Sequence, residues 1–141
     1  MYEVYKVVRI ENDGRLSSAC CRNSFPDKFR VYYKVGVNTK PNIKESMLFA
    51  FTDLEEAKDF ADNFMEPHAI YLAHATKLFK NIKPQNIGYY NVFKSLNDFW
   101  KKLYEAKKNK KRMDKVGTPM RLDYKSTVCC PSLKLIKELH V

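Results

Sequence analysis

Residues 47–64 (MLFAFTDLEEAKDFADNF) show the pattern that most constrains the fold. The apolar run 47–51 has the length of a buried strand. Thr52 follows as a candidate helix N-cap, with Glu55 three residues on, the spacing of a capping box. Apolar residues then recur at helical spacing, and they are Leu54, Ala57, Phe60, Ala61 and Phe64. The stretch predicts a buried strand that turns directly into an amphipathic helix, whose apolar face packs on a sheet.

Other apolar runs predict further strands, at residues 2–10, 16–21, 29–35, 69–76, 126–130 and 133–139. Between the first two, Asn12-Asp13-Gly14 is typical of a hairpin turn. Residues 36–45 predict an exposed loop. Residues 95–111 predict a second helix, because Ser95 and Asp98 have capping-box spacing and an apolar face follows. This order predicts a single α+β domain over residues 1–141, a mostly antiparallel sheet carrying two helices.

Composition limits the class of partner. A chain of 141 residues with 45% hydrophobic residues can bury a core without metal or disulfide support. The formal net charge of +10 favours anionic partners, namely nucleic acid, nucleotide phosphates, an acidic protein surface or anionic lipid. No run approaches the length of a membrane span, and the N-terminus has no apolar signal region. We therefore expect an intracellular protein without a membrane partner, and its oligomeric state is left open.

The cysteines form two adjacent pairs, Cys20-Cys21 and Cys129-Cys130. Zinc sites usually separate paired cysteines by two to four residues, and adjacent strand residues point to opposite faces. The pairs are therefore interpreted as reduced thiols that pack as small hydrophobic groups. His68, His74 and His140 show no metal-ligand spacing, and no glycine-rich phosphate loop occurs. We expect no metal and no cofactor.

Catalytic patterns are weak in this sequence. Glu55, Glu56 and Asp59 fall on the predicted exposed side of the first helix, where a solvated face explains them. A strand followed by a helix and another strand is similar in topology to the small core of ADP-ribosyltransferases. Residues 69–76, however, contain no glutamate to act as the catalytic acid that such a resemblance implies. The sequence therefore predicts a protein that is not an enzyme.

A basic segment, residues 101–115, is the remaining feature. Its cations can neutralise phosphates, and Tyr104 can stack on bases, as can Tyr89 and Tyr90 nearby. A solvated helix end is the other interpretation, since cations there favour the negative pole of the helix dipole. The predicted binding residues for nucleic acid or an acidic partner are Lys101, Lys102, Tyr104, Lys107, Lys108, Lys110, Lys111, Arg112 and Lys115.

Three segments resemble small, uncharacterised proteins of phages and large DNA viruses: residues 31–36 (VYYKVG), 48–60 (LFAFTDLEEAKDF) and 126–137 (STVCCPSLKLIK). The resemblance rests on packing and turn residues and implies no activity. It suggests a viral accessory or virion-associated protein, located in a host cytoplasm or in a virion. Together with the basic segment, it predicts a non-enzymatic viral accessory protein whose basic helix, about residues 95–115, engages nucleic acid or an acidic partner. A structural virion-associated protein is the first alternative, and a degenerate ADP-ribosyltransferase-like fold is the second.

Overall fold

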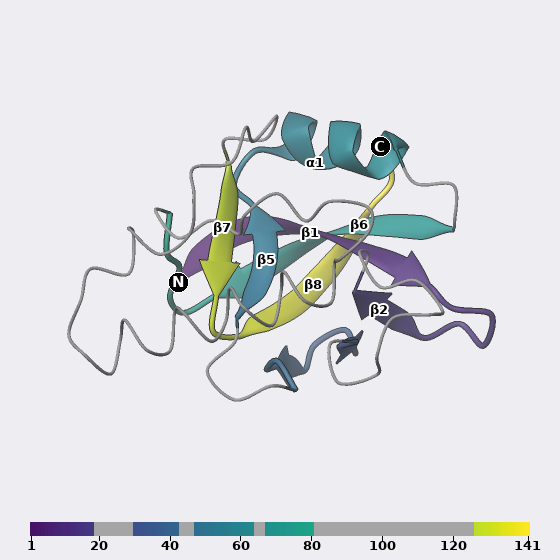
Figure 1. Ribbon diagram of the computed structural model, residues 1–141, viewed down its shortest axis with the longest axis horizontal. Helices are drawn as coiled ribbons and strands as arrows, with labels where there is room; N and C mark the ends of the chain where they lie inside the picture. The colour runs from purple at the N-terminus through teal and green to yellow at the C-terminus, as the bar shows by residue number, and fades with distance from the viewer. Residues whose placement is uncertain (19–29, 43–46, 64–66, 81–125) are drawn as a thin grey trace, which may run out of the picture.

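The computed structural model describes residues 1–18, 30–42, 47–63, 67–80 and 126–141 (Figure 1). Strands account for about half of these residues. The described elements, in chain order, are β1 (Tyr2–Ile10), β2 (Leu16–Ser18), β3 (Tyr32–Tyr33), β4 (Asn38–Thr39), β5 (Leu48–Phe51), α1 (Leu54–Asp62), β6 (His68–Ala75), β7 (Thr127–Cys130) and β8 (Leu133–Leu139).

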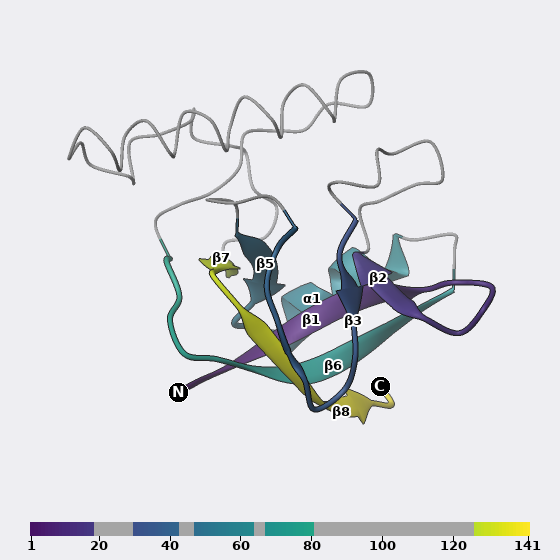
Figure 2. The ribbon, with the colours of Figure 1, turned by 90° about the horizontal axis from the view of Figure 1, so that it is seen from below.

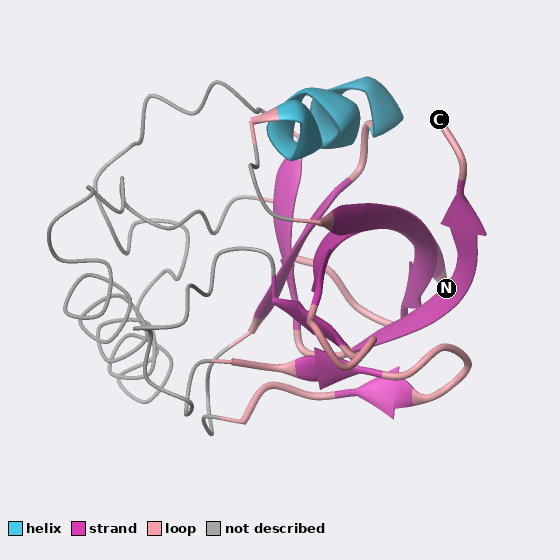
Figure 3. Cartoon of the chain, turned by 90° about the vertical axis from the view of Figure 1, so that its right-hand side faces the viewer, coloured by secondary structure: helices cyan, strands magenta, loops and turns pink. Residues whose placement is uncertain are grey.

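The strands form one curled antiparallel sheet. Its pairings, together with the short connection from β7 to β8, make a ring. β1 pairs with β6, and β6 pairs with β8. On the other side β1 pairs with β5, and β5 pairs with β7. Only Pro131 and Ser132 separate β7 from β8, so the ring closes through this bend. Figure 3 shows the strands curving around a common interior.

The interior of this ring is the main core. Strand alternation turns Val4 and Val8 of β1 inward, where they are fully buried. Leu133 and Leu135 of β8 are fully buried in the same cluster. Tyr71 also lies in it, and burial together with the nearby Glu138 carboxylate raises the pKa of its hydroxyl. The core therefore draws side chains from strands far apart in the sequence.

The helix α1 covers part of the outer surface of the ring, over β1, β5 and β6 (Figures 1 and 2). Ala57 and Ala61 are almost fully buried at this contact, because their small side chains let the helix approach the strands closely. The ring of Phe60 lies 5.2 Å from that of Phe51 in a tilted arrangement. The amphipathic helix predicted after a buried strand is confirmed, although Phe60 is only half-buried.

A β-bulge changes the facing of β8 part-way along the strand. Ala73 of β6 pairs with Leu135, whereas Leu72 pairs with Lys137, so Ile136 is an extra residue. Leu135 faces the interior, but Leu139 packs against the outer cluster beneath α1. An unbulged strand would turn both residues to the same side, since side chains alternate with a period of two.

The predicted fold class is wrong. Within the described residues α1 is the only helix, and the antiparallel sheet curls round so that the chain connects β7 to β8 through the bend at Pro131 and Ser132, rather than forming an open layer beneath two helices. The second predicted helix, residues 95–111, lies outside the described residues. Sequence pattern identified the strands other than β4 individually, but it contained no information on how β7 and β8 are arranged relative to β1.

Local predictions were more accurate, with small corrections. The hairpin turn is confirmed by Gly14, whose φ of +87° requires a residue that tolerates the left-handed region. The predicted N-cap is wrong by one residue. The Asp53 side chain accepts a hydrogen bond from the Glu55 amide, while the Thr52 hydroxyl donates to the Ser126 carbonyl. The strand predicted at 29–35 is only β3, and the loop predicted at 36–45 contains β4.

Candidate functional site

The binding residues predicted from the sequence lie outside the described residues. This applies to every one of them: Lys101, Lys102, Tyr104, Lys107, Lys108, Lys110, Lys111, Arg112 and Lys115. Tyr89 and Tyr90 lie outside as well. Their role in binding stays a prediction.

The described residues nevertheless show how charge is divided along the chain. They contain eleven lysines and arginines against nine aspartates and glutamates, a net charge of +2. The whole chain has a net charge of +10, so a net charge of +8 belongs to the remaining residues. Residues 101–115 alone hold eight basic and two acidic side chains. The excess positive charge is therefore concentrated in one part of the sequence.

Charge is also separated on the surface of the described residues. The helix α1 and its N-cap contain five carboxylates and one lysine, Lys58, which forms an ion pair with Glu55 at 3.3 Å. This acidic helix lies at the top of Figure 1, whereas the blue segment that holds β3 and β4 lies at the bottom. The five carboxylates therefore make α1 an acidic part of the described surface.

A buried lysine occupies the interior of the ring. Lys6 lies between Val4 and Val8 on the inward face of β1 and is 8% exposed. Its Nζ donates a hydrogen bond to the Phe49 carbonyl and lies 5.5 Å from the centre of the Tyr33 ring. Sequence reasoning missed this residue, although alternation in β1 already placed it on the apolar face.

The position of Lys6 follows from a change of partner along β1. One edge of β1 pairs with β6 over almost its full length. The other edge pairs with β5 only at Tyr5 and with β2 from Val8 to Ile10. Lys6 lies between the part of β1 that pairs with β5 and the part that pairs with β2. Its ammonium group links β1 to β5 by donating a hydrogen bond to the Phe49 carbonyl. A buried charge needs such a hydrogen-bonding partner, so we assign Lys6 a structural role at this junction.

Cys130 shares the interior with Lys6. Its side chain is fully buried in the core cluster, and burial raises the pKa of its thiol to about 11, an effect that the positive charge of Lys6 partly offsets. The thiolate is the reactive form of cysteine, so Cys130 is unreactive at neutral pH. Cys129 is also fully buried, but it is not part of this core cluster. Neither forms a disulfide within the part of the chain that the structure describes.

A cluster of three polar residues, Glu11, Ser17 and Arg30, lies on the opposite side of β1 from Lys6 and stabilises the β1–β2 hairpin. The Ser17 hydroxyl donates to the Glu11 carboxylate at 2.7 Å, and Arg30 Nη1 lies 4.0 Å from the same oxygen. Ser17 is fully buried, and the side chains of Glu11 and Arg30 are both nearly buried. These contacts join the hairpin to the residues before β3 and are explained by the fold alone.

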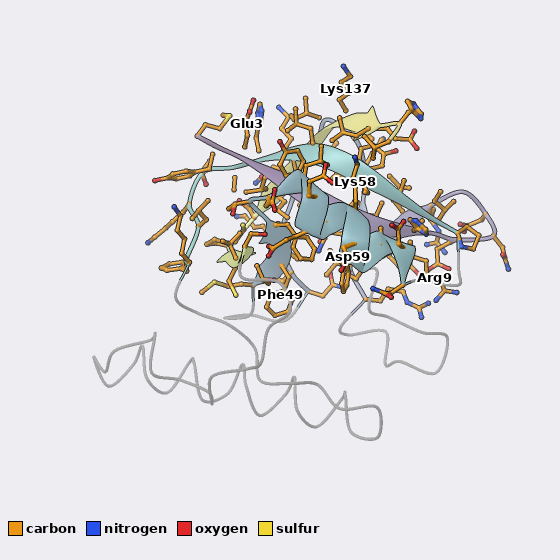
Figure 4. The ribbon with its side chains drawn as sticks, turned by 90° about the horizontal axis from the view of Figure 1, so that it is seen from above. Glu3, Arg9, Phe49, Lys58, Asp59 and Lys137 are labelled. Atoms are coloured by element: carbon orange, nitrogen blue, oxygen red, sulfur yellow. The ribbon has the colours of Figure 1, made fainter. Side chains whose placement is uncertain are left out.

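An exposed basic surface lies on β8 and directly after β4, and we call it the lysine face, consisting of Lys40, Lys134 and Lys137. Lys134 pairs with His74 of β6, and Lys137 pairs with Leu72. Figure 4 shows the Lys137 side chain extending away from the ribbon. None of the three lysines forms an ion pair within the part of the chain that the structure describes.

The described residues contain neither a metal-binding cluster nor a membrane-spanning helix. Across residues 1–18, 30–42, 47–63, 67–80 and 126–141, no group of three or more histidine, cysteine or acidic side chains is arranged to hold a metal ion. His74 Nε2 lies 3.9 Å from a Glu3 carboxylate oxygen, a surface contact. In the same described residues, no helix is long and apolar enough to cross a membrane.

Comparisons with protein-family models, with curated proteins and with solved structures found no match for this chain. Function must therefore be argued from the residues themselves. Of the features described, Lys6, Cys130 and the Glu11 group lie inside the fold. The lysine face is the exposed cluster of positive charge among the described residues.

Proposed function

We propose that this chain is a non-enzymatic accessory protein that binds nucleic acid through its basic segment, residues 101–115. One observation supports this above the others: the described fold is almost neutral, while the excess positive charge is concentrated in that segment. A dense run of cations releases condensed counterions when it neutralises phosphates, which is the main source of sequence-independent affinity.

The described residues also favour binding over catalysis. The candidate nucleophile Cys130 is buried, with its thiol held protonated. Glu55 and Asp59 are exposed on α1, as expected for a solvated helix face. A viral setting for this activity rests on the resemblance of residues 31–36, 48–60 and 126–137 to phage and large-virus proteins.

The test is fluorescence anisotropy with labelled single- and double-stranded DNA and RNA at several salt concentrations. The variant replaces four lysines with glutamine, at Lys107, Lys108, Lys110 and Lys111. Each phosphate contact contributes about 0.9 to the salt slope on duplex DNA and about 0.7 on single strands. The variant should therefore lower the slope by about 3.6 and about 2.8 respectively. Affinity should fall equally for unrelated sequences, because phosphate contacts do not read bases.

The matched control makes the same change in net charge elsewhere, with glutamine at Arg15, Lys58, Lys77 and Lys80. Binding close to that of the wild type is expected from this control. If the wild-type protein binds none of the probes at low salt, the proposed function is refuted. If the two variants lose affinity equally, binding depends on net charge alone and the basic segment is not the site.

A further inference from the structure

The lysine face exists because of the bulge in β8. Lys134 and Lys137 are three residues apart, so a regular strand would turn them to opposite faces. The extra residue Ile136 shifts the alternation by one position, so that Lys134 pairs with His74 and Lys137 pairs with Leu72. His74 and Leu72 are two residues apart on β6 and share a face, so both lysines face the same way.

β4 extends this surface by one strand. Asn38 pairs with Lys134 on the side of β8 away from β6, and Lys40 lies two residues further along. Lys40 directly follows Thr39, the last residue of β4. Lys40, Lys134 and Lys137 are all exposed. Two cations thus lie on one face of β8, with a third at the end of the neighbouring strand.

Few negative charges oppose these lysines. Glu3 is on the same face but two strands away from β8, where its carboxylate lies 3.9 Å from His74. Glu138 pairs with the inward-facing Tyr71, and its carboxylate lies 4.0 Å from His140. The acidic helix α1 lies over β1, β5 and β6 on the same outer side of the sheet, and Leu139, two positions beyond Lys137, packs beneath it. The lysine face lies beside this helix, on β8 and next to β4, and its three exposed cations are complementary to an anionic partner.

The spacing of the lysines suits a phosphate chain. Two positions along a strand span about 7 Å, and neighbouring strands lie about 4.8 Å apart. These separations match the scale of successive phosphates along a nucleic-acid strand. Tyr5 and Leu72, which occupy the row beside Lys137, are partly buried. The surface therefore presents point charges without an open aromatic platform, which favours phosphate contacts over base stacking.

We propose that the lysine face is a second contact surface for the phosphate backbone of nucleic acid, in addition to the basic segment. This inference rests on the proposed function and extends it to the folded part of the chain. Binding at Lys40, Lys134 and Lys137 is independent of sequence, because lysines that contact phosphates do not read bases.

Lysines near a sheet edge also have a purely structural explanation, since charge there prevents pairing with other chains. That role predicts that removing them causes association of the protein while nucleic-acid affinity is retained. The two explanations therefore differ in a measurable way, through the salt slope of binding and the oligomeric state in solution.

The experiment measures nucleic-acid binding by the full chain with glutamine at Lys40, Lys134 and Lys137. The matched control has glutamine at Lys58, Lys77 and Lys80, the same change in net charge. We expect the lysine-face variant to lower the salt slope on duplex DNA by about 2.7, with equal losses for unrelated sequences. The control should bind like the wild type. Arginine at the same three positions should restore binding, because it keeps the charge while changing the side chain.

Each other outcome overturns a specific statement. If the lysine-face variant binds like the wild type while the basic-segment variant loses affinity, the inference fails and the proposed function stands. If the wild type binds no probe, the proposed function fails and the inference fails with it. If the lysine-face variant self-associates on size-exclusion chromatography with an unchanged salt slope, the lysines only protect the sheet edge.

Discussion

Replacing Phe60 with alanine should lower the free energy of unfolding by about 2.5 kcal/mol. A fully buried phenylalanine costs about 3–5 kcal/mol on truncation, but Phe60 is only half-buried, so roughly half of that loss applies. The ring contact with Phe51, at 5.2 Å and tilted by 47°, adds about 1 kcal/mol. Alanine recovers about 0.5 kcal/mol through its higher helix propensity.

Urea denaturation of four proteins would measure this: the wild type, Phe60→Ala, Phe51→Ala and the double variant. The double-mutant cycle should give a coupling energy of about 1 kcal/mol for the two rings. Asp62→Ala is the control, because Asp62 is exposed on the same helix and should change stability by less than about 0.5 kcal/mol. A Phe60→Ala midpoint equal to that of the wild type would refute the packing of α1 on the sheet. A coupling energy of zero would show that the ring contact contributes nothing.

Two further predictions concern the core and the hairpin. Burial raises the pKa of Cys130 from an ordinary value of 9.0 to about 11, so its contribution to stability is complete below pH 9 and is lost as pH rises toward 11. Denaturation at several pH values should show this decline in the wild type and a smaller one in Cys130→Ala; equal declines would contradict it. Gly14→Ala should destabilise the protein by about 1 kcal/mol through backbone strain alone, since φ is +87° and an added Cβ meets nothing within 4 Å. An unchanged thermal midpoint would show that the turn relaxes to another conformation.

Features encoded within a few neighbouring residues could be predicted from the sequence. The strand–helix unit of β5 and α1 was identifiable because its apolar periodicity changes from strand to helix within a short stretch. The bounds of β1 agree with the prediction, and so do those of β8. The N-cap was misplaced because Thr52 and Asp53 are both good capping residues, and the Thr52 hydroxyl bonds to the distant Ser126 carbonyl instead.

Features that depend on distant parts of the chain could not be predicted. The bulge at Ile136 is defined by pairing with β6, so the sequence alone gave no reason to place Lys134 and Lys137 on one face. Lys6 was overlooked because its role depends on a tertiary feature: one edge of β1 pairs first with β5 and then with β2. The basic segment was visible as a run of charge, which needs no tertiary information.

The bend at Pro131 and Ser132 has a consequence for the order in which the protein folds during synthesis. β5 and β6 leave the ribosome long before β7 and β8, which are the strands that cover their edges. Until residues 127–139 emerge, the nascent chain can form only an open sheet whose uncovered edges can pair with other chains. Ring closure is therefore a late step that depends on contacts between distant segments, and such contacts form slowly. The growing chain is most exposed to aggregation just before β7 and β8 are made, and this is the stage at which a chaperone would have the greatest effect on yield.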